Sequence, residues 1–237
     1  MRNLKAVYFK EMKSYFNSPM AYIFLVIFAV ITGYFFTRTF FLFNQSDMRS
    51  LFNIIPLVYL FFIPAVTMSL IAREKNLGTM EVISTLPLKD LDFVAGKFLA
   101  ALSLVLAGLL VSMVHFITLT QVGTNIDYGA VFTGYLGLAL AGAVYSAVGT
   151  FASSLTDNQV VAFIIGIFIV LIFFLMDKML MFVPAALTGI IQYLSVDYHL
   201  SNISRGVIDS RNLIYFASVV GLFLFMTVRM LEIRRWK

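Results

Sequence analysis

The sequence predicts an all-α polytopic membrane protein with six transmembrane helices, on three observations. Hydrophobic residues make up 61% of its 237 residues and charged residues only 12%, whereas a soluble domain carries about 25% charged residues. The basic residues lie in short clusters between apolar stretches. Those stretches approach the ~20 residues that a membrane-spanning helix needs. They cover residues 20–43, 51–72, 98–120, 129–152, 160–176 and 213–230.

The positive charges indicate how these spans are oriented. Six spans place twelve of the seventeen Lys and Arg residues on the cytoplasmic side, with both chain ends there, and positive residues resist translocation. The segment 179–196 is also apolar, but Pro184 and Gly189 interrupt it. A seventh span there would move the basic C-terminal residues outside. We therefore expect this segment to form a re-entrant or interfacial helical hairpin on the outer side.

The first 18 residues are expected to form an amphipathic helix along the inner membrane surface. Apolar residues recur there at helical spacing while lysines occupy the other side, and basic amphipathic helices bind membrane surfaces. Ser18 and Pro19 suit the N-cap and first position of the next helix. This divides the chain into an elbow helix (1–18) and a transmembrane domain (19–237). A basic flank without fixed structure is the alternative.

The cytoplasmic loop 73–97 between the second and third spans has the signals of a short helix. Gly78 provides a break and Thr79 a helix N-cap. Glu81 then falls in the first turn, where the helix dipole favours a negative charge. Pro87 ends the helix after about two turns. A short rigid helix held by two spans is suited to pass force from a cytoplasmic motor to the bundle.

Small residues gather in the fourth span. Gly134, Gly137, Gly142 and Gly149 lie among alanines and serines. Small residues let helix backbones approach closely in lipid, where packing drives association. This predicts a helix-packing face, with a substrate-facing groove as the alternative.

Catalytic and metal-binding patterns are missing from the sequence. It has no Cys, no Walker A pattern, no HExxH and no GxSxG, and its two histidines, His115 and His199, are far apart. No paired carboxylates fall at membrane depth. The net charge of +5 follows membrane topology, so no nucleic-acid partner is expected. The chain is expected to bind no metal or cofactor and to be no enzyme.

Ion-coupled transport is also poorly supported, because it usually needs ionisable residues inside the bundle. The predicted membrane interior has almost none. If the protein transports a substrate uphill, its energy should come from a partner subunit. This points to a permease of the ABC type.

Three motifs resemble the ABC-2 family of exporter permeases. The loop after the second span matches E-x3-G-T-x-E followed by Leu-Pro, at Glu74, Gly78, Thr79, Glu81 and Leu86-Pro87. Residues 154–159 are similar to a second family motif. A third lies within residues 199–215, and its core contains Ser204, Arg205, Gly206 and Asp209. Together they resemble the gliding-motility (GldF-like) and NosY-like branch.

The resemblance implies an ABC-2 exporter fold, type V-like, in the inner membrane of a bacterium. By similarity, two permease subunits form a homo- or heterodimeric pore, and two ABC ATPase subunits that carry ATP and Mg²⁺ dock below it. A membrane-anchored extracytoplasmic partner is a further implication. The outer motif would either close the pathway or dock that partner. The residues implied to couple the ATPase are Arg73, Glu74, Gly78, Thr79, Glu81, Leu86 and Pro87.

Two functional hypotheses of different classes follow. The first is a permease subunit that couples ATP hydrolysis by a separate subunit to substrate export or to force transmission. The second is a non-conducting membrane scaffold that anchors partner proteins, favoured by the absence of polar residues along an evident pathway. A stoichiometric ATPase that is stimulated by this chain would favour the permease. An intramembrane enzyme is the least supported reading, because catalytic groups are missing.

Overall fold

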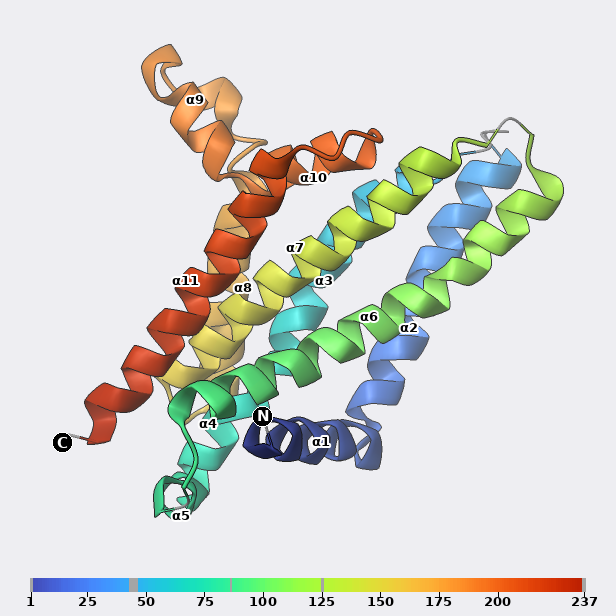
Figure 1. Ribbon diagram of the computed structural model, residues 1–237. Coiled ribbons are helices and arrows are strands. Elements are labelled where there is room, and N and C mark those ends of the chain that lie inside the picture. The colour runs from blue at the N-terminus through green and yellow to red at the C-terminus, as the bar shows by residue number, and fades with distance from the viewer. Residues whose placement is uncertain (1, 43–46, 86, 125, 236–237) are drawn as a thin grey trace.

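The computed structural model describes residues 2–42, 47–85, 87–124 and 126–235, and this part of the chain contains helices and no strand (Figure 1). The fold is therefore all-helical, as predicted. The elements are α1 (Arg2–Asn17), α2 (Pro19–Thr37), the π-helical turn η1 (Arg38–Leu42), α3 (Arg49–Thr67), α4 (Ser69–Asn76), α5 (Thr79–Thr85), α6 (Asp90–Val122), α7 (Tyr128–Leu155), α8 (Gln159–Leu175), the 3₁₀ turn η2 (Leu180–Phe182), α9 (Ala185–Leu194), α10 (Val196–Ser204) and α11 (Ser210–Arg235).

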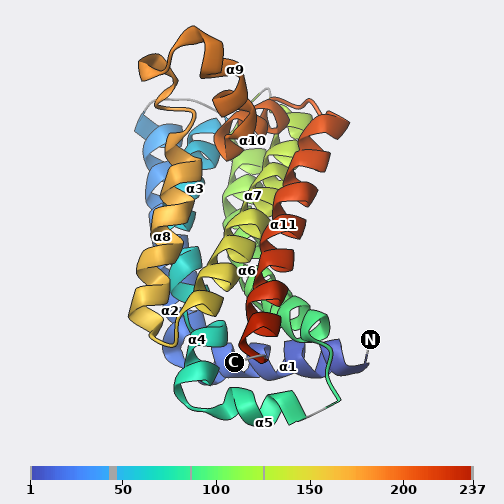
Figure 2. The same ribbon diagram turned by 90° about the vertical axis from the view of Figure 1, so that its left-hand side faces the viewer.

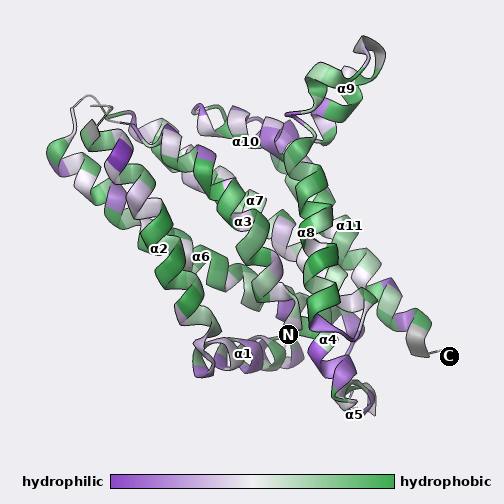
Figure 3. Ribbon diagram, turned by 180° about the vertical axis from the view of Figure 1, so that it is seen from behind, coloured by the Kyte–Doolittle hydropathy of each residue, from purple (hydrophilic) through white to green (hydrophobic). Residues whose placement is uncertain are grey.

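Five segments of the described chain are long and apolar enough to cross a membrane. They correspond to the first four predicted spans and the last one. The remaining predicted span, α8, is apolar but has only 17 residues, at the short end of the range for spanning helices. The chain is thus a multi-pass membrane protein, while a count of six spans stays a prediction. Figure 3 shows hydrophobic residues along α2 and α8 and hydrophilic ones around α4. The five segments are Pro19–Phe41, Arg49–Asn76, Asp90–Val122, Tyr128–Leu155 and Ser210–Ile233.

Helix α7 lies at the centre of the bundle, packed against α3, α6, α8, α10 and α11 (Figures 1 and 2). Its glycines allow this packing. A Cβ atom on Gly149 would lie 2.0 Å from Thr67 Oγ1, and one on Gly134 would lie 2.1 Å from the Phe52 ring. Gly142 and Gly137 have comparable close neighbours, at 2.8 Å, on α6 and α10. All four glycines singled out in the sequence therefore lie at helix–helix contacts.

Helix α1 lies across one end of the bundle, and α5 lies beyond it (Figure 2). The apolar face of α1 is buried against α6, where the side chain of Val7 fills the space at Gly96. A Cβ atom on that glycine would lie 2.8 Å from Val7 Cβ. Ser18 is the N-cap of α2 and Pro19 its first residue, as predicted, but the Ser18 hydroxyl donates to Tyr15 O at 3.1 Å instead of capping α2. This bond ties the end of α1 to the start of α2.

The opposite end of the bundle carries η2, α9 and α10 (Figure 1). The predicted hairpin segment 179–196 contains η2 and α9, and α9 packs mainly on α10 and η2. In Figure 1, α9 projects beyond the bundle, while α10 lies across its end. The placement of this segment as a re-entrant or interfacial hairpin stays a prediction.

Candidate functional site

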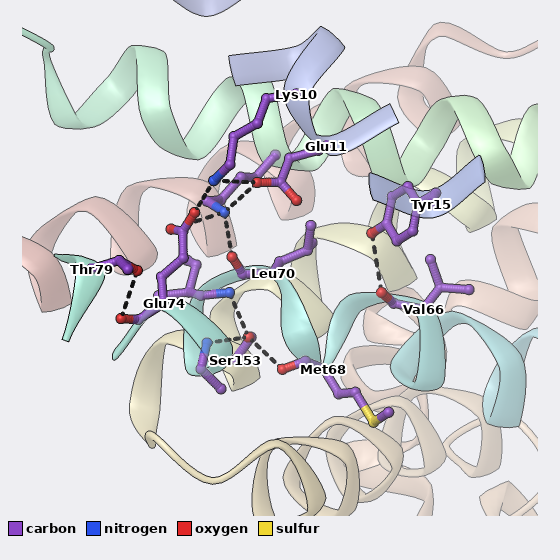
Figure 4. Close-up of polar contacts among 12 residues, drawn as sticks. Lys10, Glu11, Tyr15, Val66, Met68, Leu70, Glu74, Thr79 and Ser153 are labelled. Carbon is purple, nitrogen blue, oxygen red and sulfur yellow. Dashed lines mark hydrogen bonds and ion pairs between the residues drawn. The ribbon is translucent and has the colours of Figure 1, made fainter. Parts of the chain in front are cut away.

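The candidate site is the junction between α3 and α4, where the second span continues into the predicted coupling loop. The helix is interrupted here, because α3 ends at Thr67 and α4 begins at Ser69. The first turn of a helix has N–H groups without partners inside the helix. At α4, a side chain from another helix accepts hydrogen bonds from two such N–H groups. Ser153 Oγ of α7 accepts from Ile71 N and Ala72 N, both at 3.0 Å, and donates to Met68 O at 2.8 Å (Figure 4).

Helix α1 also bonds to this junction. The hydroxyl of Tyr15 donates to Val66 O at 3.1 Å (Figure 4). Burial raises the pKa of this hydroxyl well above the usual 10.0, and the negative charge of nearby Glu11 adds to the effect. Tyr15 is therefore a neutral hydrogen-bond donor at physiological pH.

A cluster of four charged residues lies next to the junction, and we refer to Lys10, Glu11, Glu74 and Lys97 as the charge cluster. Lys97 of α6 is fully buried. Its Nζ lies 2.7 Å from Glu11 Oε1 and 3.0 Å from Glu74 Oε2, and it also donates to the carbonyl of Leu70. Lys10 pairs with Glu74 and lies 3.3 Å from Glu11 Oε1. Figure 4 shows Lys10, Glu11 and Glu74 converging from α1 and α4.

The charges of this cluster balance, with two ammonium groups and two carboxylates. A buried charge is tolerated when it is paired and hydrogen-bonded, and Lys97 meets both conditions. Burial lowers the pKa of Lys10, but the carboxylates of Glu74 and Glu11 raise it by more, so its pKa lies above 10.5. The cluster thus joins α1, α4 and α6 through charges that have formed pairs with one another.

The segment from α4 to α5 (residues 69–85) is referred to below as the coupling element. Gly78 connects the two helices with φ +68°, a conformation that glycine adopts without strain. Glu81 falls in the first turn of α5, as predicted. Thr79 does not have its predicted N-cap role. Its hydroxyl donates instead to Glu74 O at 3.2 Å, and so satisfies a carbonyl at the C-terminal end of α4. Lys75 donates to the carbonyl of Ser154 in α7.

The predicted coupling residues separate into an inward and an outward group. Glu74 is only 7% exposed and points into the charge cluster. The others that the structure describes are exposed: Arg73, Gly78, Thr79, Glu81 and Pro87. Leu86 lies outside the described residues. The exposed group shares its surface with two apolar side chains that the sequence analysis did not single out, Leu77 at 62% and Val82 at 65% exposure.

The two other motifs form helix ends. Asn158, in the segment 154–159, caps α8 by accepting from Val160 N at 2.9 Å. In the outer motif, Gly206 has φ +93° and follows the end of α10. Asp209 Oδ1 accepts from Arg211 N at 2.8 Å in the first turn of α11. Ser204 donates to Ser201 O within α10, and Arg205 is exposed. The outer motif lies at the end of the bundle opposite the coupling element (Figure 1).

Neither histidine belongs to a group of metal ligands in the described part of the chain. His199 is buried, with its ring nitrogens 2.7 Å from Asn212 Oδ1 and 2.9 Å from Tyr193 O. His115 Nε2 lies 3.3 Å from Thr32 Oγ1. Both side chains connect neighbouring segments.

Sequence reasoning missed the residues that hold the coupling element in place, namely Tyr15, Glu11, Lys97 and Ser153. Two signals were available. Glu11 is the one acidic residue among the basic residues of the first 18, and Lys97 is embedded in apolar residues at the start of a span. Both are unusual enough to suggest a buried partner.

A family model described as ABC-2 family transporter protein matches residues 43–228. The chain belongs to this ABC-2 family. The match covers α3 to α10 and most of α11, and therefore contains the coupling element and both other motifs. No curated protein matches the chain. An ABC-2 family protein is a membrane component of an ABC transporter, and the family implies association with an ATPase subunit.

Proposed function

We propose that this ABC-2 family chain is a permease subunit of an ATP-driven exporter whose ATPase is a separate cytoplasmic subunit. The observation that carries the proposal is the coupling element, which extends beyond the bundle at the same end as α1 and the C-terminal end of α11 (Figure 2). The basic residues of the loop and both chain ends favour the cytoplasm for that end.

The exposed surface of the coupling element has the composition of a docking site. Leu77 and Val82 are apolar and more than half exposed, and Arg73 and Glu81 provide charges of both signs beside them. An apolar centre with a polar rim is typical of protein–protein interfaces. We propose that this surface contacts the ATPase.

The mechanism follows from the attachment of α5 to the bundle through α4. When the ATPase subunits close on ATP, the ATPase surface that contacts α5 moves, and α4 passes this movement to the bundle. Two permease subunits would form the pathway between them for a hydrophobic or amphipathic substrate, or would transmit force without a substrate. The chain itself supplies no chemistry, and ATP and Mg²⁺ would be bound by the partner.

Further parts of the proposal rest on the sequence resemblance. They are the gliding-motility (GldF-like) and NosY-like branch, the bacterial inner membrane, six spans with both ends in the cytoplasm, and a membrane-anchored extracytoplasmic partner. The exposed apolar residues of η2 and α9 suit the membrane–water interface on the extracytoplasmic side of the inner membrane.

The test is purification of the tagged chain from its native host in lipid nanodiscs. We expect a stoichiometric ATPase whose hydrolysis rate rises when the chain is bound. Val82→Asp should weaken this association because it places a charge in the apolar centre of the surface. Val207→Asp is a matched control, since Val207 is 61% exposed at the opposite end. Absence of an ATPase would favour the scaffold, and equal effects of both variants would contradict the docking surface.

A further inference from the structure

We infer that Glu74 and Lys97 are positioning residues that link the coupling element mechanically to α1 and α6, and that Glu74 does not contact the ATPase. The inference rests on the proposed function and adds to it the path by which movement leaves α4. Its basis is the direction of the Glu74 side chain, which is buried and paired with Lys97 and Lys10.

Glu74 cannot turn toward a partner protein without leaving a charge unpaired. Lys97 is fully buried, and Glu74 provides one of its two carboxylate contacts. Removing one partner of a buried ion pair is strongly unfavourable, because the remaining charge stays in a medium of low polarity. The surface that an ATPase can reach is instead the exposed side of α5 with Leu77 and Val82.

The charge cluster makes α1, α4 and α6 move together. Lys97 belongs to α6 and bonds both to Glu74 and to the carbonyl of Leu70, so it contacts α4 at two points one turn apart. Glu11 of α1 shares the same ammonium. Helix α1 is further packed onto α6, at Gly96, and the Tyr8 hydroxyl lies 3.1 Å from Ser103 Oγ of α6. A tilt of α4 therefore displaces α1 and the N-terminal end of α6.

The pivot for such a tilt is the interruption at Met68. Ser153 of the central helix α7 bonds to Met68 O, Ile71 N and Ala72 N, so the start of α4 is fixed to α7 by side-chain bonds. Behind it, Thr67 is packed against Gly149 of α7. The first turn of α4 is thus held by α7. A tilt of the other end of α4, which carries Glu74, moves the charge cluster and also displaces the bond from Lys75 to the Ser154 carbonyl of α7.

The test separates a mechanical role from a contribution to stability. Lys97→Met alone leaves an excess negative charge and should lower the thermal stability of the chain. Glu74→Gln combined with Lys97→Met leaves Lys10 paired with Glu11 and should recover most of that stability. We expect the double variant to bind the ATPase as the wild type does. Its stimulation of the ATPase should fall at least about fivefold, the lower end of typical coupling between sites.

The matched control removes another ion pair. Lys178 and Asp197 lie 2.7 Å apart at the opposite end of the bundle, and Lys178→Met with Asp197→Asn should leave stimulation unchanged. Wild-type stimulation by a stable Glu74→Gln/Lys97→Met chain would overturn the inference. If that chain does not fold, Glu74→Gln alone decides. It removes the charge that joins α4 to Lys97 and Lys10, while Lys97 keeps Glu11 and the Leu70 carbonyl. Stimulation should again fall at least about fivefold, and an unchanged rate would overturn the inference.

A readout without the ATPase keeps the two proposals distinguishable. Backbone amides of α1 and α4 in the purified chain should exchange hydrogen faster in the double variant, and those of α10 should not change. If no ATPase binds the wild type, the proposed function fails and exchange still tests the link. If exchange in α1 stays at the wild-type rate, the link itself is wrong.

Discussion

Lys97 is buried at the start of an apolar helix because three oxygen atoms surround its ammonium group, from Glu11, Glu74 and the Leu70 carbonyl. Each oxygen comes with its own structural requirement. The carboxylates must be brought by two other helices, and the carbonyl must lie beside the α3–α4 junction. A charge in such surroundings is well defined in position, which suits the positioning role proposed for Lys97.

Gly149 is the residue at which close helix packing has the sharpest consequence. Gly149→Ala would bring a Cβ atom to 2.0 Å from Thr67 Oγ1, so α3 and α7 would have to separate. We expect the free energy of unfolding to fall by about 1–3 kcal/mol, as for other overpacked sites. Gly221→Ala is the control, because nothing lies within 4 Å of its Cβ position. Equal melting temperatures of the two variants in nanodiscs would contradict this packing.

The raised pKa values of Tyr15 and Lys10 predict that α1 is attached more weakly at high pH. The pKa of Lys10 is raised above 10.5, so its contribution to stability is complete below that value and is lost as the pH rises through the folded pKa. The pKa of Tyr15 is raised well above 10.0, so the unfolded chain loses this proton first and stability again falls as the pH rises above 10.0. Melting temperatures should therefore stay level up to about pH 9 and decline above about pH 10, less steeply for Tyr15→Phe. An identical decline would show that Tyr15 does not contribute.

At the scale of elements, the turn between α4 and α5 sets the direction of the surface proposed to meet the ATPase. Gly78 has φ +68° and no atom near its Cβ position, so a substitution there acts through the backbone alone. Gly78→Val should strain the turn by about 1–2 kcal/mol, whereas Gly78→Asn should be tolerated better because Asn adopts this conformation more readily. We expect ATPase stimulation to fall for Gly78→Val and to be largely kept for Gly78→Asn. The same loss in both variants would contradict a backbone effect.

The elements themselves were largely predictable, since each depends on local patterns. Apolar runs predicted the long helices, the spacing of apolar residues and lysines predicted α1, and Gly78 with Pro87 bracketed α5. Predictions of individual bonds were less successful. Thr79 and Ser18 were expected to cap the helices that follow them, yet both hydroxyls donate backward, to Glu74 O and Tyr15 O. Local sequence does not determine whether a hydroxyl accepts from the N–H groups that follow it or donates to a carbonyl that precedes it.

The candidate site was predictable only in part, because its decisive contacts join residues that are distant in sequence. Glu74 was recognised from its motif, but its partner Lys97 was counted as one more basic residue of the cytoplasmic loop. Lys97 and Glu11 are 86 residues apart, and no periodicity relates them. Ser153 falls between the predicted fourth span, 129–152, and the motif 154–159, and only the fold brings it to the first turn of α4.

At the scale of the whole molecule, the polar segments lie at the two ends of an apolar bundle. One end carries α1, the charge cluster and the coupling element, and the other carries α9, α10 and the outer motif (Figures 1 and 2). The central helix α7 contacts elements of both ends, because it packs on α4 and on α10. In the proposed mechanism, a movement at the coupling element would reach the opposite end through one continuous helix.

The side of the membrane on which the coupling element lies tests this account most directly. The chain has no cysteine, so single cysteines can be introduced without background at Val82 in α5 and at Met181 in η2, both strongly exposed. We predict that a membrane-impermeant maleimide labels Val82→Cys in inside-out vesicles but not in spheroplasts, and labels Met181→Cys in spheroplasts but not in inside-out vesicles. Labelling of Val82→Cys from outside spheroplasts would contradict a coupling element that meets a cytoplasmic ATPase.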